Sequence, residues 1–466
     1  MIVVKNKTLH FFSLWLLIAL LTIVIFITIP FGNFQRTDFN VFVTFAVNGF
    51  LWICLLIKEA NKYSYSLMMM HWLFCFLFFF VAPIVQFANN FFPWVNALSS
   101  DSITKANIYL TFWTFFVILG HSLKIKPYKN KTIFYFKRNK KLWYLTLFLT
   151  FMSVLIMIYR LKTAGFSNLL SRGTASIHYS DLSSISLILN KVLQAISYFA
   201  VIFSFINEKI NKRGKIFIII AFATLLISYF PSSLSRNAAG VVYFGLLLTM
   251  SSYMKKNKNF LVLFLSLFII IFPFLNAFRR ASFYDVDIIM YLKNIVNNIS
   301  NIWMANSYDA YTMLNVVMEY ININGNTFGH QLLGVFFFFI PRTLWLSKPI
   351  GSGAFVSGNS LWNFTNVSCP LPAEALINFG ITGLIIFAIF VGFICKKIDS
   401  FYWKNIDVSG EQINKFELIY PVLLMFFFFM CRGDLLSSTA YMIAYIIVWY
   451  ILIKFININI KIKNFN

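Results

Sequence analysis

The sequence is poor in acidic residues, histidine and cysteine, and each shortage excludes a class of protein. Only 15 of its 466 residues are Asp or Glu, and the five histidines show no HExxH or HxxxH spacing. We therefore predict no metal site and no cofactor. The five cysteines contain no CxxC pair and form no disulfide framework. No basic helix or soluble module stands apart from the apolar runs, which excludes nucleic acid as a partner.

Apolar residues dominate what is present, at 59% of the chain with a mean hydropathy of +0.76. About 20 consecutive apolar residues cross a bilayer as a helix. The pattern predicts one all-α integral membrane domain over residues 1–466, with twelve spans. The predicted spans are 9–30, 40–57, 65–87, 106–123, 142–160, 184–206, 216–231, 238–254, 260–278, 373–395, 418–431 and 435–453. The first span lacks a small-x-small cleavage site, so we expect it to be retained.

The linkers between these spans alternate between lysine-rich and lysine-poor. Lysine-rich linkers face the cytoplasm, so both termini are predicted to be cytoplasmic. The densest such linker, 124–141, fixes the orientation of the whole chain. The few lysines predicted outside are Lys105, Lys162, Lys191, Lys293 and Lys348.

Arginine has the opposite distribution. Only Arg138 and Arg213 are predicted inside. The arginines predicted outside are Arg36, Arg160, Arg172, Arg236, Arg279, Arg280, Arg342 and Arg432. Topology treats lysine and arginine alike, so orientation does not explain the difference. Guanidinium offers a planar fork of donors that matches phosphate oxygens. The sequence therefore predicts an anionic, phosphate-bearing substrate on the outer face.

Two predicted outer segments are long, 160–183 and 276–372. The second contains helical patterns at 286–299 and 304–321, which predict an ordered periplasmic cap. Its apolar stretch 332–341 is too short to cross the membrane. We expect that stretch to dip into the outer leaflet.

Three of the outer arginines follow or precede a span directly. Arg236 lies in the short turn "SSLSRNAAG" (232–240), where small residues permit close approach of a head group. Arg279 and Arg280 follow the ninth span, and two guanidinium forks match the two phosphates of a pyrophosphate. The alternative is that Arg236 snorkels to water and that the pair is an interfacial anchor.

The segment "FFIPRTLWLSKPIGSG" (338–353) places Arg342 and Lys348 between two prolines. Proline fixes φ, so we predict a rigid loop that preorganises two cations; the alternative is a connector. Glu374 opens the tenth span, where a carboxylate is expensive. It is predicted either to take a proton from an attacking hydroxyl or to cap its helix.

The remaining polar features carry weaker expectations. Asp285 and Asp287 have the DxD spacing of a metal site, but two aspartates before a helical pattern are more often caps. His178 and His330 are expected at the polar surface, with His330 a minor candidate base.

Together, "SLSRNA", "NAFRR", "FIPRTLWLSKP" and "PLPAEALINFGITG" resemble the bacterial O-antigen polymerase family, also called oligosaccharide repeat unit polymerases. The similar part runs from about 232 to 392; the N-terminal half is similar in hydropathy alone. The family pattern also includes an arginine followed eleven positions later by glycine. Arg342 and Gly353 have that spacing, whereas Arg172 lacks the matching glycine.

The resemblance implies a polytopic glycosyltransferase of the bacterial inner membrane that uses no metal. Its substrate would be an oligosaccharide on undecaprenyl pyrophosphate, and a chain-length-regulating co-polymerase would be its partner. On this hypothesis the pyrophosphates lie against Arg236, Arg279, Arg280 and Arg342. Glu374 would orient or deprotonate the acceptor, and Arg172 would hold the glycan or a second lipid head. Lys348 and His330 complete the predicted substrate site. The alternatives are an O-antigen ligase, a lipid-linked oligosaccharide flippase, or a structural or receptor protein without turnover.

Overall fold

The computed structural model describes residues 38–125, 135–136, 138–170, 184–256, 259–277, 289–290, 293, 299–360, 362, 364–407 and 412–456. Within these ranges the chain forms helices and two isolated β-bridges, and no strand. Eight of the helical segments are long and apolar enough to cross a bilayer. The protein is therefore an all-α, multi-pass membrane protein.

The eight helices fall where the hydropathy predicts spans. They are α2 (Phe39–Lys62), α3 (Leu67–Phe76) with η1 (Leu77–Val81) and α4 (Ala82–Ala88), α5 (Ser100–Ser122), α6 (Lys140–Ala164), α8 (Ser184–Asn211), α9 (Lys215–Ser228) with η2 (Pro231–Ser233), α19 (Leu371–Asn405) and α21 (Leu435–Phe455). Three further predicted spans are helical but not among the eight. They are α10 (Arg236–Ala239) with η3 (Gly240–Phe244) and α11 (Gly245–Met250), α13 (Phe260–Ala277), and α20 (Phe416–Arg432). The predicted span 9–30 lies outside the described residues, so the count of twelve stays a prediction.

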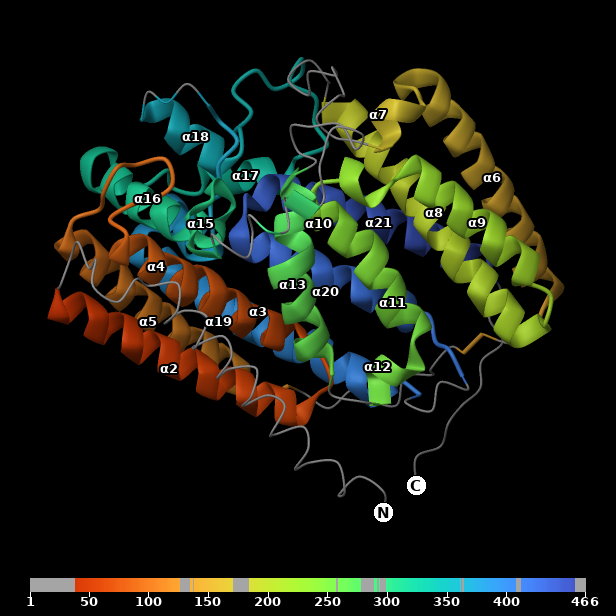
Figure 1. Ribbon diagram of the computed structural model, residues 1–466, viewed down its shortest axis with the longest axis horizontal. Coiled ribbons are helices and arrows are strands. Elements are labelled where there is room, and N and C mark those ends of the chain that lie inside the picture. The colour runs from red at the N-terminus through yellow and green to blue at the C-terminus, as the bar shows by residue number, and fades with distance from the viewer. Residues whose placement is uncertain are drawn as a thin grey trace.

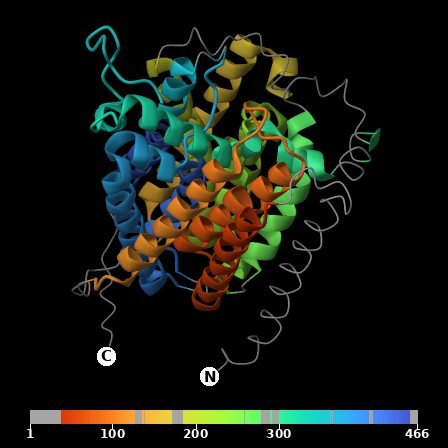
Figure 2. The same cartoon turned by 90° about the vertical axis from the view of Figure 1, so that its left-hand side faces the viewer.

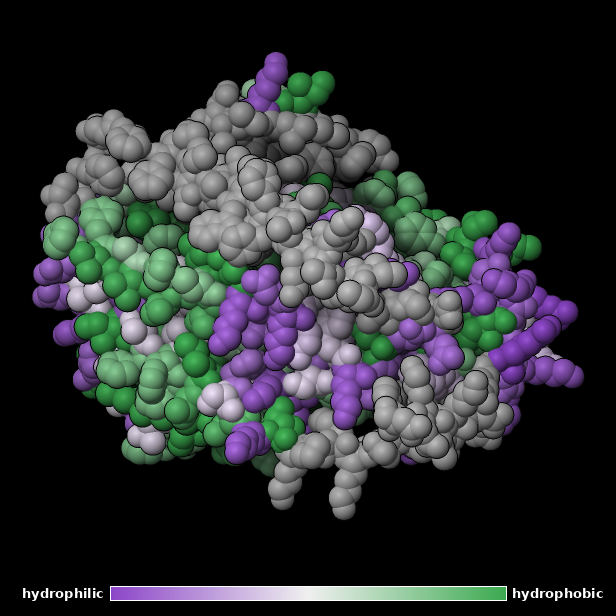
Figure 3. Space-filling view, turned by 90° about the horizontal axis from the view of Figure 1, so that it is seen from below, coloured by the Kyte–Doolittle hydropathy of each residue, from purple (hydrophilic) through white to green (hydrophobic). Residues whose placement is uncertain are grey.

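The centre of the bundle is the segment Leu67–Ala88, which is buried over most of its length. Its phenylalanines pack inside the protein: the Phe74 and Phe78 rings stack with centroids 4.6 Å apart, and Phe78 meets Phe428 of α20 edge-on at 6.1 Å. Outward-facing side chains of the surrounding helices, such as Phe50 and Phe390, are exposed and apolar. On helices long enough to cross a bilayer, such a surface indicates contact with lipid. Figure 3 shows hydrophobic surface on the side where α2 lies, with hydrophilic side chains at the centre and right.

Glycines set how closely α19 approaches α5. A Cβ on Gly120 would overlap the carbonyl oxygen of Ile389, and a Cβ on Gly392 would overlap that of Val117. Small residues at such crossings let helix backbones pack in direct contact, which is the main source of helix association in lipid. These contacts hold α19 against α5 beside the central segment.

The described part of the long outer segment forms a cap on one end of the bundle. It contains α15 (Ile299–Met304), η4 (Asn306–Tyr308), α16 (Ala310–Asn324), α17 (His330–Phe336) and α18 (Ser352–Asn359). Figures 1 and 2 show these helices together at the end opposite α12 (Ser252–Lys256), and we call this end the cap end. The pattern 304–321 predicts one helix, but the chain breaks at η4 because Asp309 turns inward to tertiary partners. The predicted helix 286–299 lies almost wholly outside the described residues.

The apolar stretch 332–341 is not a longer helix, since α17 ends at Phe336 and turns follow. Phe336, Phe339 and Leu346 are all more than half exposed. The expectation that this segment dips into the outer leaflet stays a prediction, and the exposed apolar surface fits it.

Candidate anion-binding site

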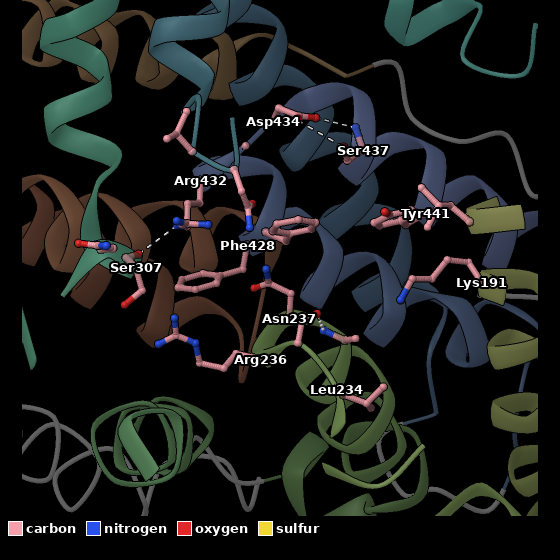
Figure 4. A pocket seen from close by; sticks show the side chains of 18 of the residues that line it. Lys191, Leu234, Arg236, Asn237, Ser307, Phe428, Arg432, Asp434, Ser437 and Tyr441 are labelled. Atoms are coloured by element: carbon pink, nitrogen blue, oxygen red, sulfur yellow. Dashed lines mark hydrogen bonds between the residues drawn. The ribbon is translucent and has the colours of Figure 1, made fainter. Parts of the chain in front are cut away.

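A cavity of about 680 Å³ lies at the cap end of the bundle. Among the residues that the structure describes, four cationic side chains and one carboxylate line it. These are Arg160, Lys191, Arg236, Arg432 and Asp434. Arg160, Lys191 and Arg236 come from α6, α8 and α10, while Arg432 and Asp434 lie on either side of Gly433 between α20 and α21, so four separate stretches of the chain converge on one space (Figure 4). Concentrated positive charge of this kind favours an anionic ligand.

The Arg432 side chain is held by two hydrogen bonds to the segment that precedes α16. Its Nε donates to the carbonyl of Ser307 at 3.0 Å, and its Nη2 donates to Oδ1 of Asp309 at 2.8 Å. Asp309 is fully buried, and its Oδ2 accepts from the indole N–H of Trp94 at 2.9 Å and from the backbone N–H of Ser368 at 3.1 Å. The guanidinium is therefore preorganised. Among the described residues its Nη1 group has no hydrogen bond, which leaves that donor for a ligand.

Arg236 enters the cavity from the first turn of α10. Ser235 caps that turn, since its side chain accepts from the backbone N–H of Ala238 at 3.3 Å. Figure 4 shows the Arg236 side chain directed into the cavity on the same side as Ser307. Burial raises the pKa of the nearby Tyr308 phenol to about 12, while the charges of Arg236 and Arg432 oppose that rise. Both guanidinium charges therefore act on the same phenol group of the cavity wall.

Arg160 and Lys191 also line the cavity, and Figure 4 shows Lys191 on the side away from Arg236 and Arg432. The Arg160 guanidinium lies 4.7 Å from the Tyr229 ring centroid, a cation–π arrangement. Its Nε is buried and has no hydrogen-bond partner in the described part of the chain. Lys191 donates to Oε1 of Gln194 at 3.0 Å and lies 5.1 Å from the Tyr441 ring centroid. The aromatic contacts stabilise the two cations at the cavity wall.

Aromatic side chains form part of the cavity wall near the bundle core. Phe78, Phe268 and Phe428 line it, and Phe268 meets Phe428 edge-on at 6.0 Å. Charges interact more strongly next to such apolar surface than in water. The cavity therefore combines fixed cations with a low-dielectric wall, which is the arrangement that stabilises developing negative charge.

Among the described residues that line the cavity, Asp434 is the only one with a carboxylate. It caps α21, since Oδ1 accepts from the backbone N–H of Ser437 at 2.7 Å. Burial raises its pKa above the usual range of an aspartate. Gly433 before it has φ +81°, and a Cβ there would overlap the carbonyl oxygen of Cys369. Glycine is required at this position to place Asp434.

Glu374 lies outside the cavity lining. Its two oxygens accept hydrogen bonds from Ser352 Oγ at 2.7 Å and from the backbone N–H of Leu435 at 2.9 Å, and it is almost fully buried. The carboxylate thus joins α18 to the starts of α19 and α21. Glu374 does not cap its own helix, because α19 has no side-chain cap; it accepts instead from the first backbone N–H of α21 and so holds the residue that follows Asp434. Its predicted role toward the acceptor stays a prediction.

Arg342 and Lys348 also lie away from the cavity wall, and they bond to their own loop. Lys348 Nζ donates to the carbonyls of Phe338 at 2.6 Å and Ile340 at 2.8 Å. Arg342 donates to the carbonyls of Lys348 at 2.8 Å and Pro349 at 3.2 Å. Burial, with the Arg342 charge second, lowers the pKa of Lys348. The two cations therefore hold backbone acceptors of their own loop, and the rigidity expected from the prolines stays a prediction.

The other predicted residues divide into two groups. His330 is exposed at the start of α17 and does not line the cavity. Outside the described residues lie Arg172, Arg279, Arg280, His178, Asp285 and Asp287. Among the residues the structure describes, no group of three His, Cys, Asp or Glu side chains is arranged to hold a metal ion.

Sequence reasoning identified Arg236 but no other charged residue of the cavity as a site residue. Arg160 and Arg432 belong to the arginines predicted on the outer side, and this uneven distribution of arginine is the sequence feature that indicates them. No local sequence pattern indicates Lys191 or Asp434.

Comparison with models of known families, with curated proteins and with solved structures finds no match to this chain.

Proposed function

We propose that this protein is a glycosyltransferase that polymerises undecaprenyl-pyrophosphate-linked oligosaccharide repeat units. One observation carries the proposal: three guanidinium groups and an ammonium group converge on one cavity beside an apolar wall. A pyrophosphate carries several anionic oxygens close together, so it can accept hydrogen bonds from several fixed guanidinium groups in a confined space. The resemblance of segments 232–392 to the O-antigen polymerase family supports the same substrate.

In the proposed reaction, an acceptor hydroxyl oxygen attacks the anomeric carbon of the donor glycan. The bond between that carbon and the pyrophosphate oxygen breaks, and undecaprenyl pyrophosphate leaves as an anion. Arg160, Arg236 and Arg432 stabilise the charge that develops on the leaving group. No metal is required, because guanidinium groups supply the positive charge.

The proton of the acceptor hydroxyl passes to Asp434 in this proposal. Asp434 lines the cavity and has a raised pKa, as a general base working near neutral pH requires. Glu374 then has a positioning role, through its bond to Leu435. The substrate contacts predicted for Arg342, Lys348, His330, Arg172, Arg279 and Arg280 stay predictions.

The proposed orientation places the cap end in the periplasm of a bacterial inner membrane, with both termini in the cytoplasm. A flippase would need its charges along a central pathway through the membrane, whereas this cavity lies at one end of the helices. An O-antigen ligase uses the same donor chemistry, and the phenotype of a gene deletion separates it from a polymerase.

Two experiments test the proposal. The first measures binding of undecaprenyl pyrophosphate to the purified full chain in nanodiscs, for wild type and for Arg160→Lys, Arg236→Lys and Arg432→Lys. Lysine keeps the charge but loses the bidentate fork, so each variant is expected to bind about tenfold more weakly, equivalent to about 1.4 kcal/mol. Arg138→Lys is the matched control, because Arg138 is exposed and lies outside the cavity.

The second experiment deletes the gene in its own bacterium. A polymerase deletion leaves single repeat units on the final acceptor, a ligase deletion leaves no glycan there, and a flippase deletion leaves lipid-linked units on the cytoplasmic face. Full-length chains in the deletion strain, or wild-type affinity in all three cavity variants, would refute the proposal.

A further inference from the structure

Trp94 occupies a backbone position that normally requires glycine. It lies in the tight turn 92–95, whose ends are joined by the bridge between Phe92 and Val95. Pro93 precedes it, and Trp94 has φ +72°. A turn with proline second and a positive φ third favours Gly or Asn at the third position. Placing a bulky residue there costs about 1–3 kcal/mol, and such strain persists where the surroundings fix it.

Tertiary contacts fix the Trp94 indole where the cavity borders the hydrophobic core. Its N–H donates to Asp309, and its ring packs on Phe364 with centroids 4.4 Å apart. Phe364 stacks in turn on Trp362 at 5.3 Å. The indole lines the cavity and is only partly buried. An aromatic surface is thus held at the wall of a cationic site.

One carboxylate sets the spacing between this indole and a cation. Asp309 binds Arg432 through Oδ1 and Trp94 through Oδ2. The guanidinium and the indole are therefore separated by the width of one buried, immobile group. A ligand that reaches both must carry an anionic part directly attached to a part that stacks on an aromatic face.

We infer that Trp94 is the stacking platform for the sugar attached to the pyrophosphate, so that the cavity has a donor-sugar subsite next to its anion site. This inference rests on the proposed function. The C–H groups on one face of a pyranose carry partial positive charge and pack against the negative face of an aromatic ring. Asn306, Thr365 and Asn366 line the same cavity and offer hydrogen bonds to sugar hydroxyls. A polyprenyl chain has no groups to pair with them.

The test compares two probes on the full chain in nanodiscs: undecaprenyl pyrophosphate, and undecaprenyl-pyrophosphate-linked N-acetylglucosamine. Trp94→Leu keeps apolar volume but removes the aromatic face. It is expected to weaken binding of the sugar-bearing probe about tenfold, as for loss of an aromatic contact, and to leave the sugar-free probe unchanged. Trp94→Phe, which keeps a ring but lacks the N–H, is expected to retain most of the sugar-dependent affinity.

The outcomes separate the two proposals. If Trp94→Leu weakens both probes equally or neither, the sugar subsite is wrong, while loss of both probes in Arg432→Lys still supports the anion site. If wild type binds neither probe, both proposals fail. Thermal unfolding checks that each variant is folded. If the Trp94 variants do not fold, Asn366→Ala tests the subsite instead, because Asn366 is exposed and its replacement leaves the core intact. A severalfold loss of affinity for the sugar-bearing probe alone supports the subsite. Unchanged affinity for that probe overturns it.

Discussion

Replacing Asp309 by asparagine is the sharpest test of how the cavity is held together. The carboxylate is fully buried and accepts from Arg432, Trp94 and Ser368 at 2.8, 2.9 and 3.1 Å, using both oxygens. Asparagine presents one acceptor and one donor. Whichever way the amide turns, its NH₂ faces a donor, and the charge that pairs with Arg432 is gone.

The expected cost follows from these contacts. A hydrogen bond to a charged group contributes about 1.5–3 kcal/mol and a neutral one about 0.5–1.5 kcal/mol. Removing one partner of a buried ion pair typically costs about 3–5 kcal/mol, because the remaining charge is left unpaired. Arg432 is 24% exposed, so water partly compensates. We expect Asp309→Asn to lower the free energy of unfolding by about 3 kcal/mol.

The measurement is unfolding of the purified protein in mixed micelles by added SDS, followed by circular dichroism. Glu319→Gln is the control, because Glu319 is exposed on α16 and the same chemical change there is expected to stay within about 0.5 kcal/mol of wild type. If Asp309→Asn also stays within that range, the argument that Asp309 anchors the cavity is wrong.

Three further predictions concern the cap end. Lys348→Met removes the donor to the carbonyls of Phe338 and Ile340. We expect it to lower the free energy of unfolding by about 2–3 kcal/mol and to make proteolysis of the loop 338–348 faster. A proteolysis rate equal to that of the control variant Lys105→Met would contradict this. Burial raises the folded-state pKa of Asp434, so its charged form opposes folding above the unfolded pKa of about 3.9. Asp434→Asn is therefore expected to be more stable than wild type at pH 7, with a gain that shrinks toward pH 4; a pH-independent difference would refute the assignment. A nitroxide on Leu346→Cys, with Cys54→Ser, is expected to be relaxed by oxygen more than by an aqueous nickel complex, since Leu346 is 90% exposed in an apolar segment; the reverse order would place this loop in water.

The sequence determined the membrane-spanning framework. Length and hydropathy alone located segments such as α6 and α19, because a helix in lipid must satisfy its own backbone whatever its neighbours are. The predicted helix 304–321 was wrong at its start, since Asp309 serves Arg432 and Trp94 instead of continuing a helix. The predicted excess of arginine on the outer side also predicted an anion site at one end of the bundle, and Arg236, taken from the turn 232–240, lines the cavity found there.

Only the tertiary structure decided which charged residues meet. Arg432 is fixed by Asp309, 123 positions away, and no local pattern links them. Lys348 and Arg342 have the same charge and the same predicted side as the cavity residues, yet they bond to carbonyls of their own loop. Which cation faces a cavity depends on packing between distant helix ends. A charge pattern along the chain records the side of the membrane and contains no information about those contacts.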